Sequence, residues 1–384
     1  MTGCGAGTDG MRIVSDISWL LSEHRYEVVR QIHEGGMGIV YEARQLGSRG
    51  FVKRVAIKVV RERYAQNAEF IENFVGEAKL VADLIHTNIV QTYHLGDSRG
   101  SYFIAMELIR GVNLEQFLQQ LVKQQQTLPR ELAVFVVSRV VRGLAYAHSK
   151  MDPDGNPLGI VHRDVNPKNI MIALEGDVKL TDFGVAKARG FLTDKEGEEV
   201  AGKPEYMSPE QADFQITDKR SDIFSAGVVL LQLLSGQNIF KGPTPEDSRQ
   251  RVLACQLPEL APLCPDLPVK LEEIIRRTLA RDPAARYQTA DEFLYELEYF
   301  IYHKGYGPTN ETLGKFIREL FKVEIAAQKA DRHGKSGETM KLAGATTSRL
   351  PRTDEAPGRA GGTRVTPKKA TKPGLFQQLK AKLK

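Results

Sequence analysis

The sequence predicts an α+β fold in which a small sheet-rich part is followed by a larger helical part. Between residues 26 and 93 the chain contains short β-branched runs, and Val55–Val60 is suited to a buried strand. After Gly111 the apolar residues recur every four positions, as in helices that pack on a core; they are Leu132, Val136, Val140 and Leu144. Strands gathered in one part and helices in the other are typical of this fold class.

The sheet-rich part contains signals for individual strands and for one helix. Val28–Ile32 and Ile39–Ala43 predict two strands on either side of a glycine cluster. Between Val60 and Thr87 the apolar spacing predicts a helix, with Glu77 on or beside its apolar face. The residues with this spacing are Phe70, Phe74, Val81 and Leu84.

The helical part contains three further predicted helices, over residues 221–235, 269–281 and 290–302. The apolar run at Ala226–Leu234 is too short to cross a membrane and contains Gln232, so we expect a buried helix there.

The composition of the 384 residues is that of a globular protein with appendages. Hydrophobic residues make up 41% of the chain, which is enough to form a core, and charged residues make up 26%.

The cysteines Cys4, Cys255 and Cys264 form no C-x-x-C pair, so we expect free thiols rather than disulfides or zinc ligands. The sequence has neither a long apolar run nor a secretory signal, so we expect a cytoplasmic protein without a transmembrane segment.

The chain divides into four predicted segments. They are an N-terminal extension (1–25), the main domain (26–302), a helical extension (303–328) and a disordered basic tail (329–384). The tail holds 14 Lys and Arg against 4 Asp and Glu, a net charge of +10, whereas the rest of the chain carries −5. With few large apolar residues, the tail cannot offset the entropy cost of ordering.

The tail ends in a segment with two interpretations. Leu375, Leu379 and Leu383 recur every four residues between lysines, which suits a short basic amphipathic helix for a membrane surface or a partner groove. The alternative is a frayed, solvated end, because residues 374–384 form only a few helical turns. We expect no nucleic-acid binding, because the basic stretch has no interleaved aromatic residues.

Two motifs in the sheet-rich part suggest phosphate binding. The run Glu34-Gly35-Gly36-Met37-Gly38 lies between two predicted strands, where glycines let the backbone approach phosphates closely; the alternative is an ordinary turn. Lys58 ends the buried run Val55-Ala56-Ile57, and a buried ammonium needs an anion, which Glu77 or a phosphate would supply. A surface lysine at a strand end is the alternative.

Two motifs in the helical part suggest phosphoryl transfer to a hydroxyl group. In His162-Arg163-Asp164-Val165-Asn166-Pro167-Lys168-Asn169, Asp164 can orient a hydroxyl and take its proton. Asn169, and Asp182 in Asp182-Phe183-Gly184, offer the oxygen ligands that Mg²⁺ prefers. Each motif alone is weak, but the four occur together in this order and at these separations.

With these motifs, residues 26–301 resemble the Hanks-type (eukaryotic-like) protein Ser/Thr kinases found in bacteria, over about 70% of the chain. The similarity is strongest with the soluble kinases of myxobacteria, on the basis of the insert Asp154-Gly155-Asn156-Pro157 and of Gly202-Lys203. The resemblance implies a bilobal kinase fold with ATP bound in the cleft between the lobes.

The resemblance also implies residue roles. Met106 would lie behind the adenine, the backbone of Glu107 and Ile109 would bond its edge, and Asn113 would lie near the ribose. The implied nucleotide-binding residues are Ile32, His33, Glu34, Gly35, Gly36, Met37, Gly38, Val40, Ala56, Lys58, Met106, Glu107, Ile109, Asn113, Asn169 and Asp182. The implied catalytic residues are Asp164, Lys58, Glu77, Asn166 and Lys168, with Asn169 and Asp182 as metal ligands.

Other implied roles concern the frame around the site. Glu210, in Ser208-Pro209-Glu210, would pair with Arg286, and Asp222 would brace the catalytic loop. Arg163 would bind a phosphate on the activation segment, where Thr193 is the candidate for phosphorylation.

Three positions depart from the family pattern. His33 stands where the glycine loop normally begins with Gly, which would alter nucleotide affinity. Asn166 stands where Ser/Thr kinases usually place a Lys that meets the γ-phosphate, and it would donate a hydrogen bond instead. On that interpretation, Asn166→Lys should be tolerated. Lys203 replaces a common Thr, which blurs the choice between Ser/Thr and Tyr as acceptors.

We therefore expect an ATP- and Mg²⁺-dependent protein serine/threonine kinase that phosphorylates itself and protein substrates in bacterial signalling. The alternative is a pseudokinase, or scaffold, that recruits partners through its tail. The presence of Lys58, Glu77, Asp164, Asn169 and Asp182 favours the enzyme.

Overall fold

The computed structural model describes residues 25–35, 38–61, 64, 67–98, 101–183 and 203–326. The expectations for residues 1–24, for Thr193 and for the tail lie outside these residues. So do Gly36, Met37 and the side chain of Glu77.

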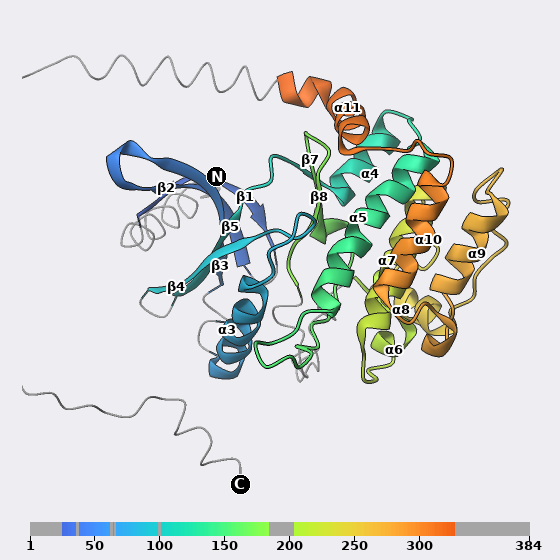
Figure 1. The fold of residues 1–384 in the computed structure, drawn as a ribbon, viewed down its shortest axis with the longest axis horizontal. Coiled ribbons are helices and arrows are strands. Elements are labelled where there is room, and N and C mark those ends of the chain that lie inside the picture. Colours follow the sequence, from blue (N-terminus) through green and yellow to red (C-terminus); the bar gives the residue numbers. More distant parts are fainter. Residues whose placement is uncertain are drawn as a thin grey trace, which may run out of the picture. The chain divides into compact units, whose positions relative to one another are not determined.

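The first part is sheet-rich, as predicted, and its sheet has five antiparallel strands (Figure 1). Its strand order is β1-β2-β3-β5-β4, and every neighbouring pair is antiparallel. The strands are β1 (Tyr26–Glu34), β2 (Gly38–Leu46), β3 (Val52–Val60), β4 (Thr92–Ser98) and β5 (Ser101–Glu107), with a short 3₁₀ turn, η1 (Ser48–Gly50), before β3.

The predicted helix of this part is α3 (Ala68–Ala82). It begins at the N-cap Asn67, whose side chain accepts a hydrogen bond from the Phe70 amide. Its apolar face packs against the sheet in a small core formed by Val60, Phe70, Ile71, Phe74, Ala78 and Ile104.

The second part is mainly helical and carries the larger core. Its helices are α4 (Leu114–Lys123), α5 (Arg130–His148), α6 (Pro209–Ala212), α7 (Lys219–Ser235), α8 (Pro245–Ala254), α9 (Val269–Thr278) and α10 (Ala290–Tyr302). A small antiparallel sheet, β6-β7-β8, joins them; its strands are β6 (Gly111–Asn113), β7 (Ile170–Ala173) and β8 (Val178–Leu180). The 3₁₀ turns are η2 (Pro167–Asn169), η3 (Pro204–Tyr206) and η4 (Pro283–Ala285).

Helix α7 confirms the prediction of a buried helix around Ala226–Leu234. Its residues from Ser221 to Leu231 are all buried, and its C-terminal Gly236 adopts the left-handed conformation of a helix end. None of the described helices is long and apolar enough to cross a membrane.

Backbone hydrogen bonds join the two parts at strand β8. The Val90 amide donates to the Leu180 carbonyl and the Leu180 amide donates to the Asn88 carbonyl, both at 2.8 Å. The Asn88 side chain adds a bond to the Val178 carbonyl at 2.8 Å. Strand β8 is therefore fixed to the segment that leads from α3 into β4.

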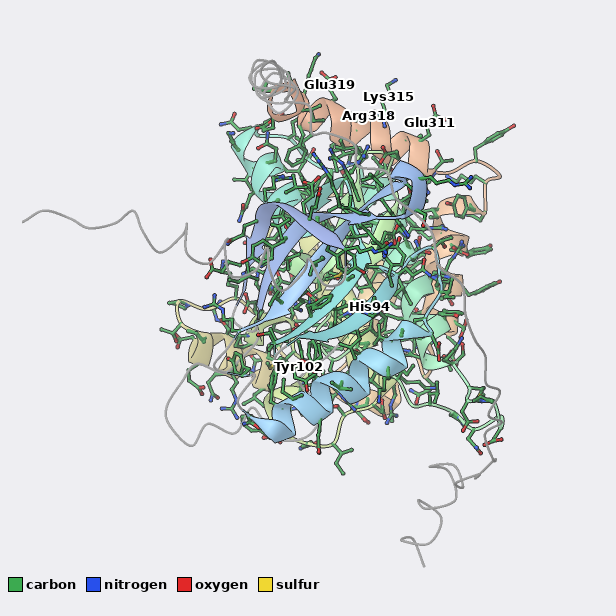
Figure 2. The ribbon with its side chains drawn as sticks, turned by 90° about the vertical axis from the view of Figure 1, so that its left-hand side faces the viewer. His94, Tyr102, Glu311, Lys315, Arg318 and Glu319 are labelled. Carbon is green, nitrogen blue, oxygen red and sulfur yellow. The ribbon has the colours of Figure 1, made fainter. Side chains whose placement is uncertain are left out.

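The predicted helical extension (303–328) contains α11 (Asn310–Leu320). Its buried Leu313 and Ile317 belong to the larger core, whereas Glu311, Lys315 and Glu319 point outward (Figure 2).

Helix α11 packs on α4 and on the turn between β7 and β8. Phe316 contacts Phe117 of α4 with ring centroids 6.1 Å apart. The Arg318 side chain donates to the Leu174 carbonyl, in the β7–β8 turn, at 2.7 Å. Gly176 lies in the turn itself, where a Cβ atom would come within 1.8 Å of the Asn310 carbonyl oxygen.

We predict that Gly176→Ala destabilises the protein far more than Gly155→Ala. Both glycines have a positive φ, +94° and +84°. Both variants therefore lose stability because an alanine is placed in the left-handed region of backbone conformation. Only the Gly176 variant also collides with the backbone of α11, because a Cβ at Gly155 meets nothing within 4 Å. We expect the free energies of unfolding, measured in urea, to differ by about 1–3 kcal/mol. Equal losses would contradict the close packing of α11 on this turn.

Candidate active site

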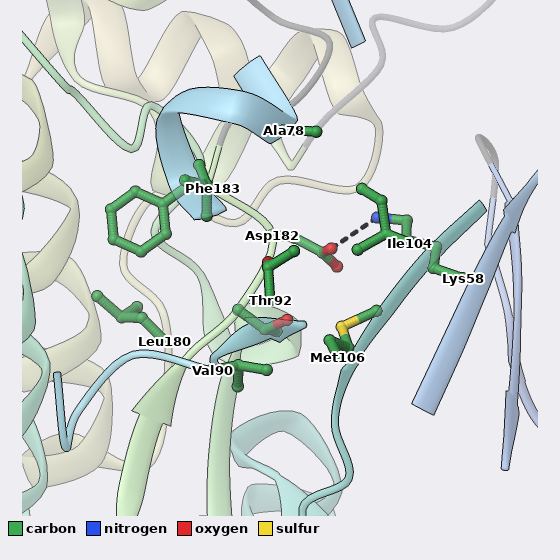
Figure 3. Close-up of a pocket in the computed structure, with 11 residues that line it drawn as sticks. Lys58, Ala78, Val90, Thr92, Ile104, Met106, Leu180, Asp182 and Phe183 are labelled. Carbon is green, nitrogen blue, oxygen red and sulfur yellow. Dashed lines mark hydrogen bonds and ion pairs between the residues drawn. The ribbon is translucent and has the colours of Figure 1, made fainter. Parts of the chain in front are cut away.

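An ion pair between Lys58 and Asp182 connects the two parts of the fold. Lys58 lies on β3, between Val40 of β2 and Ile104 of β5 in the sheet register. Its ammonium donates to Asp182 Oδ1 at 2.6 Å (Figure 3). Burial alone would raise the pKa of Asp182, but the charge and hydrogen bond of Lys58 hold it below the ordinary value. The aspartate is therefore ionised at neutral pH.

Beside this ion pair lies a pocket with mostly apolar walls (Figure 3). Helix α3, strands β4 and β5 and the end of β8 all contribute to it. Its lining residues are Lys58, Ala78, Val81, Val90, Thr92, Ile104, Met106, Leu180, Thr181, Asp182 and Phe183. Met106, predicted to lie behind the adenine, lines this pocket, and Ala56 is its register partner on β3.

The buried carboxylate of Asp222 holds the start of the catalytic loop. Its oxygens accept hydrogen bonds from the amides of His162 and Arg163, each at 2.7 Å. His148 Nε2 contacts the same carboxylate at 2.8 Å. Burial would raise the pKa of Asp222, but the contacts of His148 and His162 lower it overall. The predicted bracing role of Asp222 is confirmed by these contacts.

His162 connects the catalytic loop to the segment that carries Asp182. Its ring Nδ1 accepts from the Asp164 amide at 3.2 Å, so Nε2 carries the proton that bonds the Thr181 carbonyl at 3.1 Å. Burial lowers the pKa of His162, in keeping with a neutral ring. The ring also lies 4.6 Å from that of Phe183, centroid to centroid.

Asn169 lies beside Asp164, as the motif predicts. Its amide nitrogen donates to the Asp164 carbonyl and to Asp164 Oδ2, both at 2.9 Å. The Asn169 carbonyl in turn accepts from the Thr181 amide at 2.9 Å, which brings Asn169 close to Asp182 in the chain fold. The amide oxygen of Asn169 and the carboxylate of Asp182 are hard oxygen donors. Such a pair suits Mg²⁺, which usually takes one or two protein ligands together with substrate phosphates.

Asn166 is buried, with 4% of its surface exposed. Its Oδ1 accepts from the Lys168 amide at 2.9 Å, and its Nδ2 donates to the Asp164 carbonyl at 3.0 Å. Both ends of the amide therefore bond the loop's own backbone. Because Nδ2 carries a second N–H, the expected bond to a γ-phosphate stays a prediction. Sequence could not show these backbone bonds, because an Asn in a loop suits capping and ligand binding equally well.

The glycine loop is described in part. The Gly35 amide bonds the Gly38 carbonyl at 2.9 Å, and a Cβ at Gly38 would lie 2.5 Å from the Val59 carbonyl oxygen. Arg61 binds this loop: it donates to the Gly35 carbonyl at 3.0 Å and to Glu34 at 2.7 Å. Sequence reasoning missed Arg61, since nothing in its neighbourhood marks it as a loop partner. The loop's Ile32 and His33 lie on β1, where His33 is paired with Val40.

The residues predicted to bond the adenine edge and the ribose lie between the end of β5 and the start of α4. The Glu107 amide donates to the Gln91 carbonyl at 2.9 Å, and its carboxylate accepts from Lys179 at 3.0 Å. Asn113 is the N-cap of α4: its side chain accepts from the Gln116 amide at 2.8 Å. The roles of Glu107, Ile109 and Asn113 toward a nucleotide stay predictions. The contact between Lys179 and Glu107 was not predicted from the sequence, because the alternation of apolar and polar residues in β8 does not indicate which residue Lys179 contacts.

The predicted pair of Glu210 and Arg286 is confirmed. Arg286 is fully buried, and its two terminal nitrogens each donate to one oxygen of Glu210 at 2.8 Å. Burial would raise the pKa of Glu210, but the hydrogen bonds of Arg286 and Ser221 lower it overall. A bidentate pair of this kind fixes α6 to the chain before α10.

One carboxylate near the catalytic loop was not predicted. Glu115, in the first turn of α4, forms ion pairs with Lys203 and, at 3.9 Å, with Lys168. The sequence gives no local signal for these contacts, because the three residues lie in three separate segments. Lys168 thus points its charge toward Glu115.

We predict that Asn166→Lys destabilises the protein, contrary to the expectation from sequence. The substitution removes two loop hydrogen bonds and places an ammonium at a buried position, so we expect a loss of roughly 2–4 kcal/mol in the free energy of unfolding. Urea unfolding followed by circular dichroism measures it. Lys168→Met, which changes a half-exposed side chain of the same loop, serves as the control. A variant as stable as its parent would show that the loop is not built on Asn166.

Comparisons with known proteins agree with this geometry. The protein kinase domain family matches residues 26–299. The tyrosine-protein kinase MasK of Myxococcus xanthus is 36% identical over 299 residues, which are 78% of this chain and 46% of MasK. The serine/threonine-protein kinase PrkC of Bacillus subtilis is 36% identical over 268 residues, 70% of this chain and 39% of PrkC.

A solved structure supports the fold. The kinase domain of Mycobacterium tuberculosis PknI matches with a TM-score of 0.54 at 27% identity, over 71% of this chain and 95% of that domain. The chain spans about half or less of the length of the two curated relatives named above. The fold, the site and the family match together show that this chain belongs to the protein kinase family, with the bilobal kinase fold.

Proposed function

We propose that the protein transfers the γ-phosphoryl group of Mg-ATP to Ser and Thr hydroxyls of proteins, itself included, in bacterial signalling. The observation that carries the proposal is the Lys58–Asp182 ion pair, which lies next to the loop of Asp164 and Asn169. Relatives named serine/threonine-protein kinases support the choice of acceptor. The cytoplasmic location expected from the sequence belongs to the same proposal.

The chemistry divides among the chain's own residues. Lys58 orients the α- and β-phosphates, while Asp164 orients the acceptor hydroxyl and takes its proton. The hydroxyl oxygen forms a bond to the γ-phosphorus as the bond to the bridging oxygen of ADP breaks. Mg²⁺, held by Asn169 and Asp182, would neutralise charge on the phosphates. Positioning and charge neutralisation supply most of the catalysis, so no covalent nucleophile is needed.

The pseudokinase alternative receives no support from the comparisons, whose named relatives are kinases. The choice between Ser/Thr and Tyr is open to direct test, since one relative carries the name of a tyrosine-protein kinase. Tail contacts with a membrane or a partner, and phosphorylation of Thr193, stay predictions.

We predict that Asp164→Asn lowers phosphotransfer by roughly 10²- to 10⁴-fold, the usual contribution of a positioned general base. The purified protein is incubated with labelled ATP and Mg²⁺, and the products are examined by phosphoamino-acid analysis and mass spectrometry. We expect labelled Ser or Thr, and no transfer after chelation of the metal by EDTA.

Asp266→Asn is the matched control for this experiment. Asp266 is exposed and has a φ of 57°, a conformation that Asn tolerates well. Its activity should equal that of the parent. An Asp164→Asn variant that is folded and nearly as active as the parent would refute the role of Asp164. Phosphotyrosine alone would refute the proposed acceptor.

A further inference from the structure

Glu115 joins three segments that meet in front of the catalytic loop. The residue lies in the first turn of α4, and its Oε1 accepts from the ammonium of Lys203. Its Oε2 lies 3.9 Å from the ammonium of Lys168. A carboxylate on α4 thus contacts both the loop of Asp164, through Lys168, and the N-cap of η3, Lys203.

The side of α4 that carries Glu115 is held firmly. The N-cap Asn113 and Gln116 form a reciprocal pair of side chain to backbone hydrogen bonds at the start of the helix. Further along α4, Gln120 and Gln124 donate to the Leu320 carbonyl at 3.2 and 2.6 Å. The carboxylate is therefore presented from a helix that is fixed at both ends.

The chain after Lys203 is fixed at several other points. The Asn238 side chain donates to the Glu205 carbonyl at 3.1 Å, and the Ser225 hydroxyl donates to the Tyr206 carbonyl at 2.7 Å. Gln211 donates to the Arg163 carbonyl at 2.9 Å, which connects α6 to the catalytic loop. Lys203 is the N-cap residue of η3, so its ion pair with Glu115 ties the start of η3 to α4.

Partial burial makes this ion pair more than a surface contact. The side chains of Lys203 and Glu115 are 23% and 31% exposed, so the charges are partly removed from water and weakly screened. Lys168 is more exposed, at 47%, and farther from the carboxylate. The Lys203 pair should therefore dominate, with Lys168 as a second, weaker contact.

The contacts of Glu115 lie on the acceptor side of the site. Among the described residues, the pocket beside Lys58 and Met106 is lined by neither Glu115 nor Lys203. Both partners of Glu115 instead lie on segments that flank Asp164, the residue that would orient the acceptor hydroxyl. A change at Glu115 should thus move the acceptor more than the nucleotide.

We propose that Glu115 is a positioning residue that holds residues 203–208 in register with the catalytic loop through Lys203, and so aligns the protein acceptor with Asp164. The inference rests on the proposed function, because it concerns the acceptor of phosphoryl transfer. The inference adds Glu115 of α4 to the residues of the site. Helix α4 also packs against α11.

The test compares Glu115→Gln, Lys203→Met and the charge-reversed double variant Glu115→Lys/Lys203→Glu. We measure kcat and KM with myelin basic protein as acceptor, and the dissociation constant of a fluorescent ATP analogue with Mg²⁺. Each single variant should lose roughly 10- to 100-fold in kcat/KM for the acceptor, the cost of a small misplacement of reacting groups. ATP-analogue affinity should change by less than about twofold.

The double variant separates positioning from general damage. Restored opposite charges should make it at least about threefold faster than either single variant, although Lys168 then faces a like charge. Lys123→Met is the control, because Lys123 lies in the last turn of α4 and pairs with Glu324 at 3.4 Å, away from the loop. The control should match the parent.

Hydrogen–deuterium exchange gives a readout that needs no activity. The amides of residues 204–208 should exchange faster in Glu115→Gln than in the parent or the control. Unchanged acceptor kinetics, an equal loss of ATP-analogue affinity, or a double variant as slow as the singles would each overturn the inference. If the parent transfers no phosphate to any acceptor, the proposed function fails, and unchanged exchange in Glu115→Gln would still overturn the positioning role.

Discussion

The buried carboxylate of Asp222 is the contact on which the site most depends. It lies on α7, the helix at the centre of the larger core, and is 1% exposed. Because a buried charge is costly unless it is hydrogen-bonded, the amides of His162 and Arg163 are held firmly against it. Further along the loop, Asn166 and Asn169 both donate to the Asp164 carbonyl, and Asn169 also donates to the Asp164 carboxylate. These bonds fix the orientation of the Asp164 side chain.

Two ion pairs connect the segments around Asp164 to other parts of the fold. Strand β8 is bonded to the segment before β4, and the chain after it places Asp182 against Lys58 of β3. Glu115 of α4 contacts Lys203 and Lys168. One ion pair thus joins Asp182 to the sheet, and the other set joins Lys168 and Lys203 to α4.

The helical extension is part of this arrangement although it follows the segment matched by the kinase family. Helix α11 buries Leu313 and Ile317 in the larger core and contacts α4 through Phe316. It also rests on the β7–β8 turn, where Gly176 leaves room for its backbone. Since α4 begins at the N-cap Asn113 and carries Glu115 in its first turn, α11 packs on the helix that presents both residues.

The sequence alone determined the fold class, most helices and the residues with unusual chemistry. Lys58, Asp164, Asn169 and Asp182 stood out because charged and amide groups at buried or loop positions follow strong local patterns. The tertiary structure decided what those patterns cannot encode. The capping role of Asn166 and the pairing of Lys58 with Asp182 depend on how the loop and lobes meet, and the contacts of Glu115 join residues up to 88 positions apart. Side-chain pairing at such separations is set by tertiary packing, and it cannot be predicted from the local periodicity of the sequence.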